Sequence, residues 1–284
     1  MSLLERRTRM TTSSDVVDTH PPPTRGLSGR PAGSGLAAAV SVISLLTVGV
    51  LWWRVSGTSL PAVDRIIEGW VISHRTPALT FVFSTVTWTG SSLVVVPLVV
   101  VLAWVAWRVV GGKLAALILL LQVGNVAATQ GLKALTSRMR PSASPLGHAA
   151  EAAFPAGHSS NSVVVLGGTA VLLAAFLGGR HRVIVGSVRV ALVVVAALVG
   201  ISRVYLDVHW TTDVVAGWAL GASWLPVLWL AARAVGRPGG NPAGEEQEGS
   251  TTAPRGRLDQ AGLARPSRRG TPWEHVLLAR HDAR

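Results

Sequence analysis

Six long apolar runs, separated by short polar stretches, dominate the chain. Five of them carry no charged side chain, and the other is interrupted only by Arg189. About 20 apolar residues in a helix cross the hydrocarbon core of a bilayer, and an arginine near a helix end can extend its side chain to the headgroups. The sequence therefore predicts an all-α, polytopic bundle of six transmembrane helices. The predicted spans are Leu36–Trp53, Trp88–Trp107, Leu114–Leu132, Ser159–Gly179, Val183–Ser202 and Val214–Ala232.

The segments outside the apolar runs predict a simple domain organisation. Residues 1–33 are polar and rich in Pro, Ser and Thr, and residues 236–284 hold eight Arg and six Asp or Glu among Pro and Gly. Neither has the apolar content for a core, so both are predicted to be disordered cytoplasmic tails around one membrane domain, residues 34–235. Between the first two spans, the stretch PAVDRIIEGW predicts a short helix at the membrane interface.

Composition supports a membrane protein. Charged residues make up 14% of the 284 residues and hydrophobic residues 49%, whereas soluble domains carry roughly 25% charged residues. The net charge of +12 could indicate nucleic-acid binding, but that function needs a basic domain face, and much of this charge lies in tails and short loops. Nucleic acid is therefore not an expected partner. The chain has no cysteine, which excludes disulfide and thiolate chemistry.

Three predicted loops on one side of the membrane hold most of the polar residues that could take part in catalysis or binding. The first, GLKALTSRMRP, places six residues between Lys133 and Arg140. The second, FPAGH, ends in His158 at the start of the fourth span. The third, SRVYLDVHWTTD, contains Arg203, then His209 after five residues, then Asp213 after three more.

These residue types suit a phosphate ester. Two arginines and a lysine can neutralise about two negative charges, and arginine makes bidentate contacts to phosphate oxygens. Free N–H groups at Gly157, where the fourth span begins, attract an anion. His209 and Asp213 are four residues apart and share one helix face, so the carboxylate can fix the imidazole tautomer and stabilise its cation. No metal ion or other cofactor is needed for this charge balance.

The three motifs resemble the signature of the membrane-bound type 2 phosphatidic acid phosphatases, which share their active site with vanadium-dependent haloperoxidases. Lys133, Arg140 and Pro141 match the first part of that signature, and Ser202, Arg203, His209 and Asp213 match the third. Pro155, Ala156, Gly157 and His158 match the second except at Ala156, where the family has serine. The resemblance covers roughly residues 36–235.

This resemblance implies a fold, an activity and a role for each matched residue. It implies an integral membrane enzyme that hydrolyses a lipid phosphomonoester or pyrophosphate, such as phosphatidic acid or a polyprenyl pyrophosphate. His209 would form a phosphohistidine and Asp213 would orient it, while His158 would act as general acid and then general base. The residues expected to hold the phosphate are Lys133, Arg140, Gly157 and Arg203.

Several alternatives stay open at this level. Lys133, Arg138 and Arg140 individually fit interfacial anchors, and His158 alone fits a polar helix start. A phosphotransferase would use the same intermediate, and a catalytically weakened lipid-binding or transport protein would fit the altered second motif. Ser159 or Ser160 could supply the hydroxyl that Ala156 lacks. The oligomeric state cannot be inferred.

Two further patterns concern packing and orientation. Small residues in GGTA of the fourth span and GWALG of the sixth predict close helix contact, which would bring His158 and His209 together. Lys and Arg near the span ends number nine on the side of the termini and seven on the other. If Lys133, Arg140 and Arg203 are required for function, they are left out of the count, and nine Lys and Arg on the side of the termini compare with four on the other side. This count then favours cytoplasmic termini and an extracytoplasmic site in a multi-pass cell-membrane protein.

Overall fold

The computed structural model describes residues 33–57, 59–141, 151–177 and 181–235. The predicted tails lie outside these residues, apart from Gly33. The described residues form helices and no strands, with six of the helical segments long and apolar enough to cross a membrane. The prediction of an all-α bundle of six spanning helices is thus confirmed. The spanning segments are α1 (Ser34–Val55), α4 (Ser92–Val109), α5 (Gly112–Thr136), α6 to α7 (Gly157–Leu177), α8 (Arg182–Tyr205) and α9 (Thr211–Val235).

The fourth span is not a uniform α-helix. Its first part, α6, ends at Ser162 and its last part, α7, begins at Gly168. Between them, Val163–Gly167 form a π-helical turn, η2. A π-helical turn contains one residue more than an α-helical turn, and such turns are common near functional sites.

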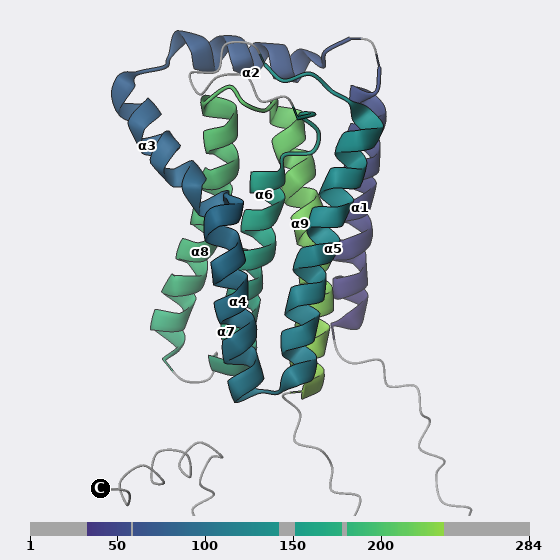
Figure 1. Cartoon of the computed structure of the whole chain (residues 1–284), viewed down its shortest axis with the longest axis vertical. Helices are drawn as coiled ribbons and strands as arrows, with labels where there is room; N and C mark the ends of the chain where they lie inside the picture. Colours follow the sequence, from purple (N-terminus) through teal and green to yellow (C-terminus); the bar gives the residue numbers. More distant parts are fainter. Residues whose placement is uncertain (1–32, 58, 142–150, 178–180, 236–284) are drawn as a thin grey trace, which may run out of the picture. The chain divides into compact units, whose positions relative to one another are not determined.

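Two shorter helices lie between the first and second spans. A short helix is present where the sequence predicts one: α2 (Ala62–Ser73) crosses one end of the bundle in Figure 1. Its place at the membrane interface stays a prediction. A further helix, α3 (Pro77–Thr87), has no counterpart in the sequence prediction; the Thr76 side chain caps it by accepting a hydrogen bond from Leu79 N. The predicted start of the second span at Trp88 is wrong by four residues. Trp88–Gly90 form a 3₁₀ turn, η1, and Ser91 is extended before α4 begins.

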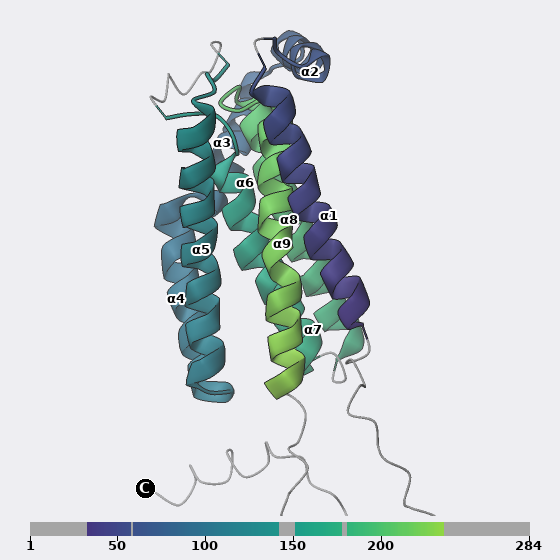
Figure 2. The same ribbon diagram turned by 90° about the vertical axis from the view of Figure 1, so that its right-hand side faces the viewer.

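Helices α6 and α9 approach each other at two glycines. A Cβ atom at Gly217 would lie 2.5 Å from the carbonyl oxygen of Ala156, and one at Gly221 would lie 2.7 Å from that of Ser160. Neither distance is compatible with a side chain, so glycine is required for this contact. The predicted close packing of the fourth and sixth spans is confirmed, and Figures 1 and 2 show the two helices side by side.

The end of the bundle away from α2 has an apolar core, called here the apolar cluster. Its buried side chains come from α4, α5, η2, α7 and α9 and are all aliphatic. The members are Val95, Val99, Ala103, Ala106, Leu114, Ala115, Ile118, Leu121, Val165, Leu172, Leu228 and Ala232. Helix α1 begins and α9 ends at this end of the bundle (Figure 2).

Candidate active site

The three polar segments singled out in the sequence meet at the end of the bundle that α2 crosses. Backbone hydrogen bonds join them: Ala156 N donates to Asp213 O over 2.9 Å, and Ala153 N donates to Arg138 O over 2.8 Å. The indole Nε1 of Trp210 donates to Met139 O over 2.9 Å. The loop after α5, the start of α6 and the loop before α9 therefore form one connected unit.

His209 is buried in this unit and has a defined tautomer. Its Nε2 lies 3.2 Å from Nη1 of Arg140, and because a guanidinium can only donate, Nε2 must be the acceptor. The proton of a neutral ring then lies on Nδ1, which is 3.6 Å from Oδ2 of Asp213 and has no hydrogen-bond partner among the described residues. Nε2 thus carries the lone pair, which accepts a hydrogen bond from Arg140, and Nδ1 faces a carboxylate.

Burial and neighbouring cations keep this imidazole neutral. Desolvation is the larger cause, and the positive charges of Arg140, Arg203 and Lys133 add to it, so the pKa of His209 lies well below its ordinary value of 6.5. Both causes disfavour an imidazolium ion. At neutral pH the ring is therefore in the form that can act as a nucleophile.

Arg140 and Arg203 surround His209 and are fixed by hydrogen bonds. Arg140 donates from Nε to Glu151 O and from Nη1 to Val208 O, over 2.9 and 3.0 Å. Arg203 donates from Nη1 to Thr87 Oγ1 over 2.9 Å, and its buried Nε has no partner among the described residues. An unsatisfied buried donor is costly, so Nε of Arg203 is available for an anion.

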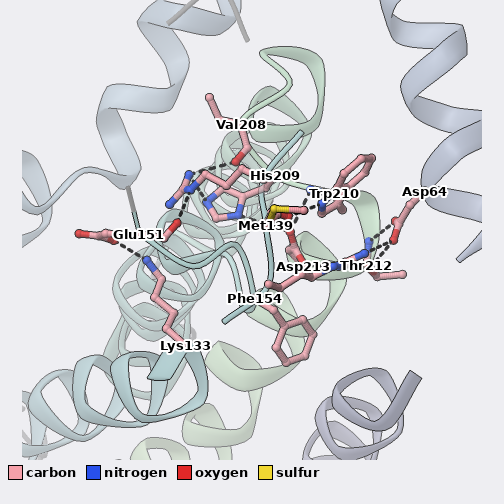
Figure 3. Close-up of polar contacts among 12 residues, drawn as sticks. Asp64, Lys133, Met139, Glu151, Phe154, Val208, His209, Trp210, Thr212 and Asp213 are labelled. Carbon is pink, nitrogen blue, oxygen red and sulfur yellow. Dashed lines mark hydrogen bonds and ion pairs between the residues drawn. The ribbon is translucent and has the colours of Figure 1, made fainter. Parts of the chain in front are cut away.

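Lys133 is paired with a carboxylate at the edge of the site. Its Nζ lies 2.6 Å from Oε2 of Glu151, and the Glu151 side chain is 66% exposed. The hydrogen bond and charge of Lys133 lower the pKa of Glu151, which keeps that carboxylate ionised. Glu151 was not singled out in the sequence, and no motif points to it. Figure 3 shows Lys133 and Glu151 on one side of His209 and Asp213 on the other.

His158 and Gly157 open helix α6. Ala156, which precedes them, has no side chain that can accept a hydrogen bond from the first N–H groups of the helix. A Cβ atom at Gly90 of η1 would lie 2.9 Å from the carbonyl oxygen of His158. His158 is also close enough to Arg203 and His209 for their charges to act on it. The structure therefore brings both sequence-predicted histidines to the same site.

Arg138, Asp64, Thr212 and Asp213 form a buried network around the start of α9, called here the Arg138 network, which the sequence did not predict. Arg138 forms ion pairs with Oδ1 of Asp213 and, over 2.7 Å, with Oδ2 of Asp64 in α2. It also donates to Thr212 Oγ1 over 2.8 Å. Taken by itself in the sequence, Arg138 fits an interfacial anchor, but in the structure it is buried. Two features of the sequence could have pointed to this network. Arg138 lies two residues before Arg140, and Asp64 is the one carboxylate in the first turn of the predicted interfacial helix.

The two serines after His158 contact different helices. Ser160 Oγ accepts a hydrogen bond from Asn125 Nδ2 over 3.0 Å and lies 3.3 Å from Thr129 Oγ1, both in α5. Ser159 packs against α9, where a Cβ atom at Gly217 would lie 3.0 Å from its own Cβ. The hydroxyl of Ser160 is thus bonded to α5. This contact does not support the prediction that Ser160 supplies the hydroxyl that Ala156 lacks.

Three comparisons with known proteins point to one family. The model of the PAP2 superfamily matches residues 111–237. Phosphatidylglycerophosphatase B of Bacillus subtilis (strain 168) is 34% identical over 167 residues, which cover 57% of this chain and 80% of that protein. The crystal structure of a transmembrane PAP2-type phosphatidylglycerolphosphate phosphatase from Bacillus subtilis is similar, with a TM-score of 0.60 and 29% identity. That match covers 68% of this chain and 94% of the other.

Proposed function

The chain belongs to the PAP2 superfamily, and we propose that it is an integral membrane lipid phosphatase acting on a lipid phosphomonoester or diphosphate. The observation that carries the proposal is the neutral His209, whose Nε2 lone pair lies among buried or half-buried cations while Nδ1 faces Asp213. A nucleophile, an orienting carboxylate and an anion-binding set are the parts that phosphoryl transfer requires.

The bound phosphate would be held by Lys133, Arg140 and Arg203 together with the N–H of Gly157. A phosphomonoester carries about two negative charges at neutral pH, and three cations compensate for them. Such fixed charges and N–H groups stabilise a transition state because they need no reorganisation during the reaction. The charge balance is complete without a metal ion.

The proposed reaction has two chemical steps. His209 Nε2 attacks phosphorus and forms a P–N bond, while the P–O bond to the lipid breaks. The imidazolium form of His158 donates its proton to the leaving oxygen and becomes neutral. Asp213 stabilises the resulting positive charge on His209 through Nδ1–H. His158 then removes a proton from water, whose oxygen attacks phosphorus, and the P–N bond breaks to give inorganic phosphate and neutral His209.

The substrate headgroup is proposed from the relatives. The named relatives are phosphatases of phosphatidylglycerol phosphate, so this lipid is the first to test, beside phosphatidic acid and a polyprenyl diphosphate. The six spans hold the site at one end of the bundle, from which a lipid phosphate can reach the cations while its acyl chains stay in the bilayer.

The site is proposed to face the extracytoplasmic side, with both termini in the cytoplasm. Of the seven Lys and Arg residues near the span ends on the site side, Lys133, Arg138, Arg140 and Arg203 are engaged within the site. Three residues remain there against nine on the opposite side, and cytoplasmic flanks carry the excess of such residues.

Phosphate release in detergent tests the proposal. Purified protein should release inorganic phosphate from at least one lipid of the panel in the presence of a metal chelator, and His209→Ala should abolish that release. Binding of these lipids without any release would favour a lipid-binding protein. Transfer of the phosphate to an added alcohol, with little free phosphate, would favour the phosphotransferase.

A further inference from the structure

Asp64 connects helix α2 to the start of α9. Its carboxylate is buried, and it accepts hydrogen bonds from Thr212 N over 2.9 Å and from Thr212 Oγ1 over 2.7 Å. Thr212 N belongs to the first turn of α9, where N–H groups have no partner within the helix. Asp64 therefore caps α9 from another helix, and Figure 3 shows it reaching Thr212 from the side opposite Lys133.

Arg138 carries the link from Asp64 to Asp213. One guanidinium nitrogen contacts Asp64 and the other contacts Oδ1 of Asp213, so a single cation lies between two buried carboxylates. Breaking a buried ion pair by removing one partner is strongly unfavourable because the other charge stays buried. Loss of either carboxylate would thus change the position or the charge balance of Arg138, and through it the environment of the other carboxylate.

This link determines which oxygen of Asp213 faces His209. Arg138 holds Oδ1, while Oδ2 accepts a hydrogen bond from Trp210 N over 2.9 Å and lies 3.6 Å from His209 Nδ1. With both oxygens fixed, the carboxylate cannot rotate away when positive charge develops on the imidazole. Such supporting contacts typically change the performance of a site by roughly 10- to 100-fold.

We propose that Asp64 and Arg138 are positioning residues, which orient His209 through Asp213 and so make the reaction depend on the docking of α2 at the site. The inference rests on the proposed phosphatase activity. Neither residue contributes to the anion-binding set of Lys133, Arg140 and Arg203. Their removal is therefore expected to lower the rate of the chemical steps and to leave phosphate binding intact.

Asp64→Asn is the primary test, because it removes the charge and keeps the size of the side chain. The expected result is a kcat about 10- to 100-fold lower, with KM and the inhibition constant of inorganic phosphate within about two-fold of wild type. Glu68→Gln is the matched control, since it makes the same acid-to-amide change in the same helix. Glu68 lies close enough to Asp64 for their charges to repel, but it takes no part in the hydrogen bonds of Asp64 and Arg138, and this control should keep the wild-type kcat.

Arg138→Lys is the second variant, in case Asp64→Asn does not fold. A lysine keeps the buried positive charge, but one ammonium group lacks the planar fork that contacts both carboxylates, so a similar loss of kcat is expected. The double variant should be no slower than the slower single variant, because both changes break the same link. Multiplicative losses would contradict the proposed link.

The outcomes separate this inference from the proposed function. An active wild type with wild-type kcat in folded Asp64→Asn or folded Arg138→Lys would overturn the positioning role alone. A parallel loss of inorganic-phosphate affinity would also overturn it, because it would indicate a general collapse of the site. A wild type that releases no phosphate from the whole lipid panel would overturn the proposed function, and the inference with it.

Discussion

The apolar cluster and the active-site end of the bundle are held together by different forces. In the apolar cluster, small aliphatic side chains of five helical segments pack together, and no ion pair links its members. At the other end, Arg138, Asp64 and Asp213 are buried with their charges paired, and backbone bonds join three loops. Aliphatic packing tolerates exchange of similar side chains, whereas the paired charges require particular atoms at particular positions. Stability and activity should therefore respond to different substitutions.

Outside the two proposed catalytic histidines, the largest expected effect is on activity and comes from Arg203→Ala. The arginine is buried, and its unsatisfied Nε is available to a phosphate oxygen, so its loss should lower kcat/KM by about 10²- to 10³-fold. Arg189→Ala is the control, because Arg189 is an exposed arginine of the same helix, α8. Steady-state kinetics in detergent would measure both. Equal losses in the two variants would remove Arg203 from the proposed phosphate-binding set.

The apolar cluster should show the reverse behaviour in Leu228→Ala. Leu228 is 4% exposed, and the cavity left by the smaller side chain should lower the free energy of unfolding by about 2 kcal/mol. SDS titration in mixed micelles would measure this, with kcat expected within two-fold of wild type. Leu120→Ala is the control, since Leu120 is 66% exposed and should lose little. A large fall in kcat without a change in stability would contradict the separation of the two regions.

Acidification should destabilise the active-site end through His209. Its folded pKa lies below the ordinary value of 6.5, so the unfolded chain binds a proton that the folded chain does not. Stability from this group is present above pH 6.5 and is lost as the pH falls below it, by at most about 1.4 kcal/mol per pH unit. The fall in Tm between pH 7.5 and 5 should be smaller in His209→Gln than in wild type. An identical fall in both would show that His209 is not a source of the pH dependence.

The smallest expected effect is at the exposed edge of the site. A substrate phosphate must compete with Glu151 for Lys133, and exposed ion pairs contribute only about 0 to 1 kcal/mol. Glu151→Gln should therefore lower KM by about two- to five-fold at unchanged kcat, as measured by phosphate release at low ionic strength. A higher KM would mean that Glu151 helps to bind the substrate.

The same difference explains what the sequence could predict. The spans follow from apolar runs, and the meeting of His158 and His209 follows from small residues in the fourth and sixth spans, because both signals are local. The predicted and observed spans differ only at their ends, as at Trp88, where a 3₁₀ turn precedes α4. The matched motifs predicted the set of cations and histidines but left their geometry open.

The missed residues share a physical reason. Asp64 lies 74 positions before Arg138, and Thr87 lies 116 positions before Arg203, so neither pair leaves a periodic or spacing signal. The roles of Asp64 and Thr87 depend on where α2 and the end of α3 dock, which is a property of tertiary packing. No spacing signal indicated the neighbours of the two serines after Ala156 either: Ser160 bonds to Asn125 of α5, and Ser159 packs against Gly217 of α9.

The π-helical turn at Val163–Gly167 has a consequence for the direction in which His158 points. Each residue of an α-helix turns the chain by about 100°, so one extra residue resets the angle between α6 and α7. Where the turn ends and α7 begins, Gly167 and Gly168 meet Leu225 and Leu228 of α9. Before the turn, the angular offset applies to His158 in α6. Deleting one residue of this aliphatic stretch would preserve its chemistry and swing the histidine to another face. The direction of the proposed general acid is thus encoded by the number of residues in a turn that contains no reactive group.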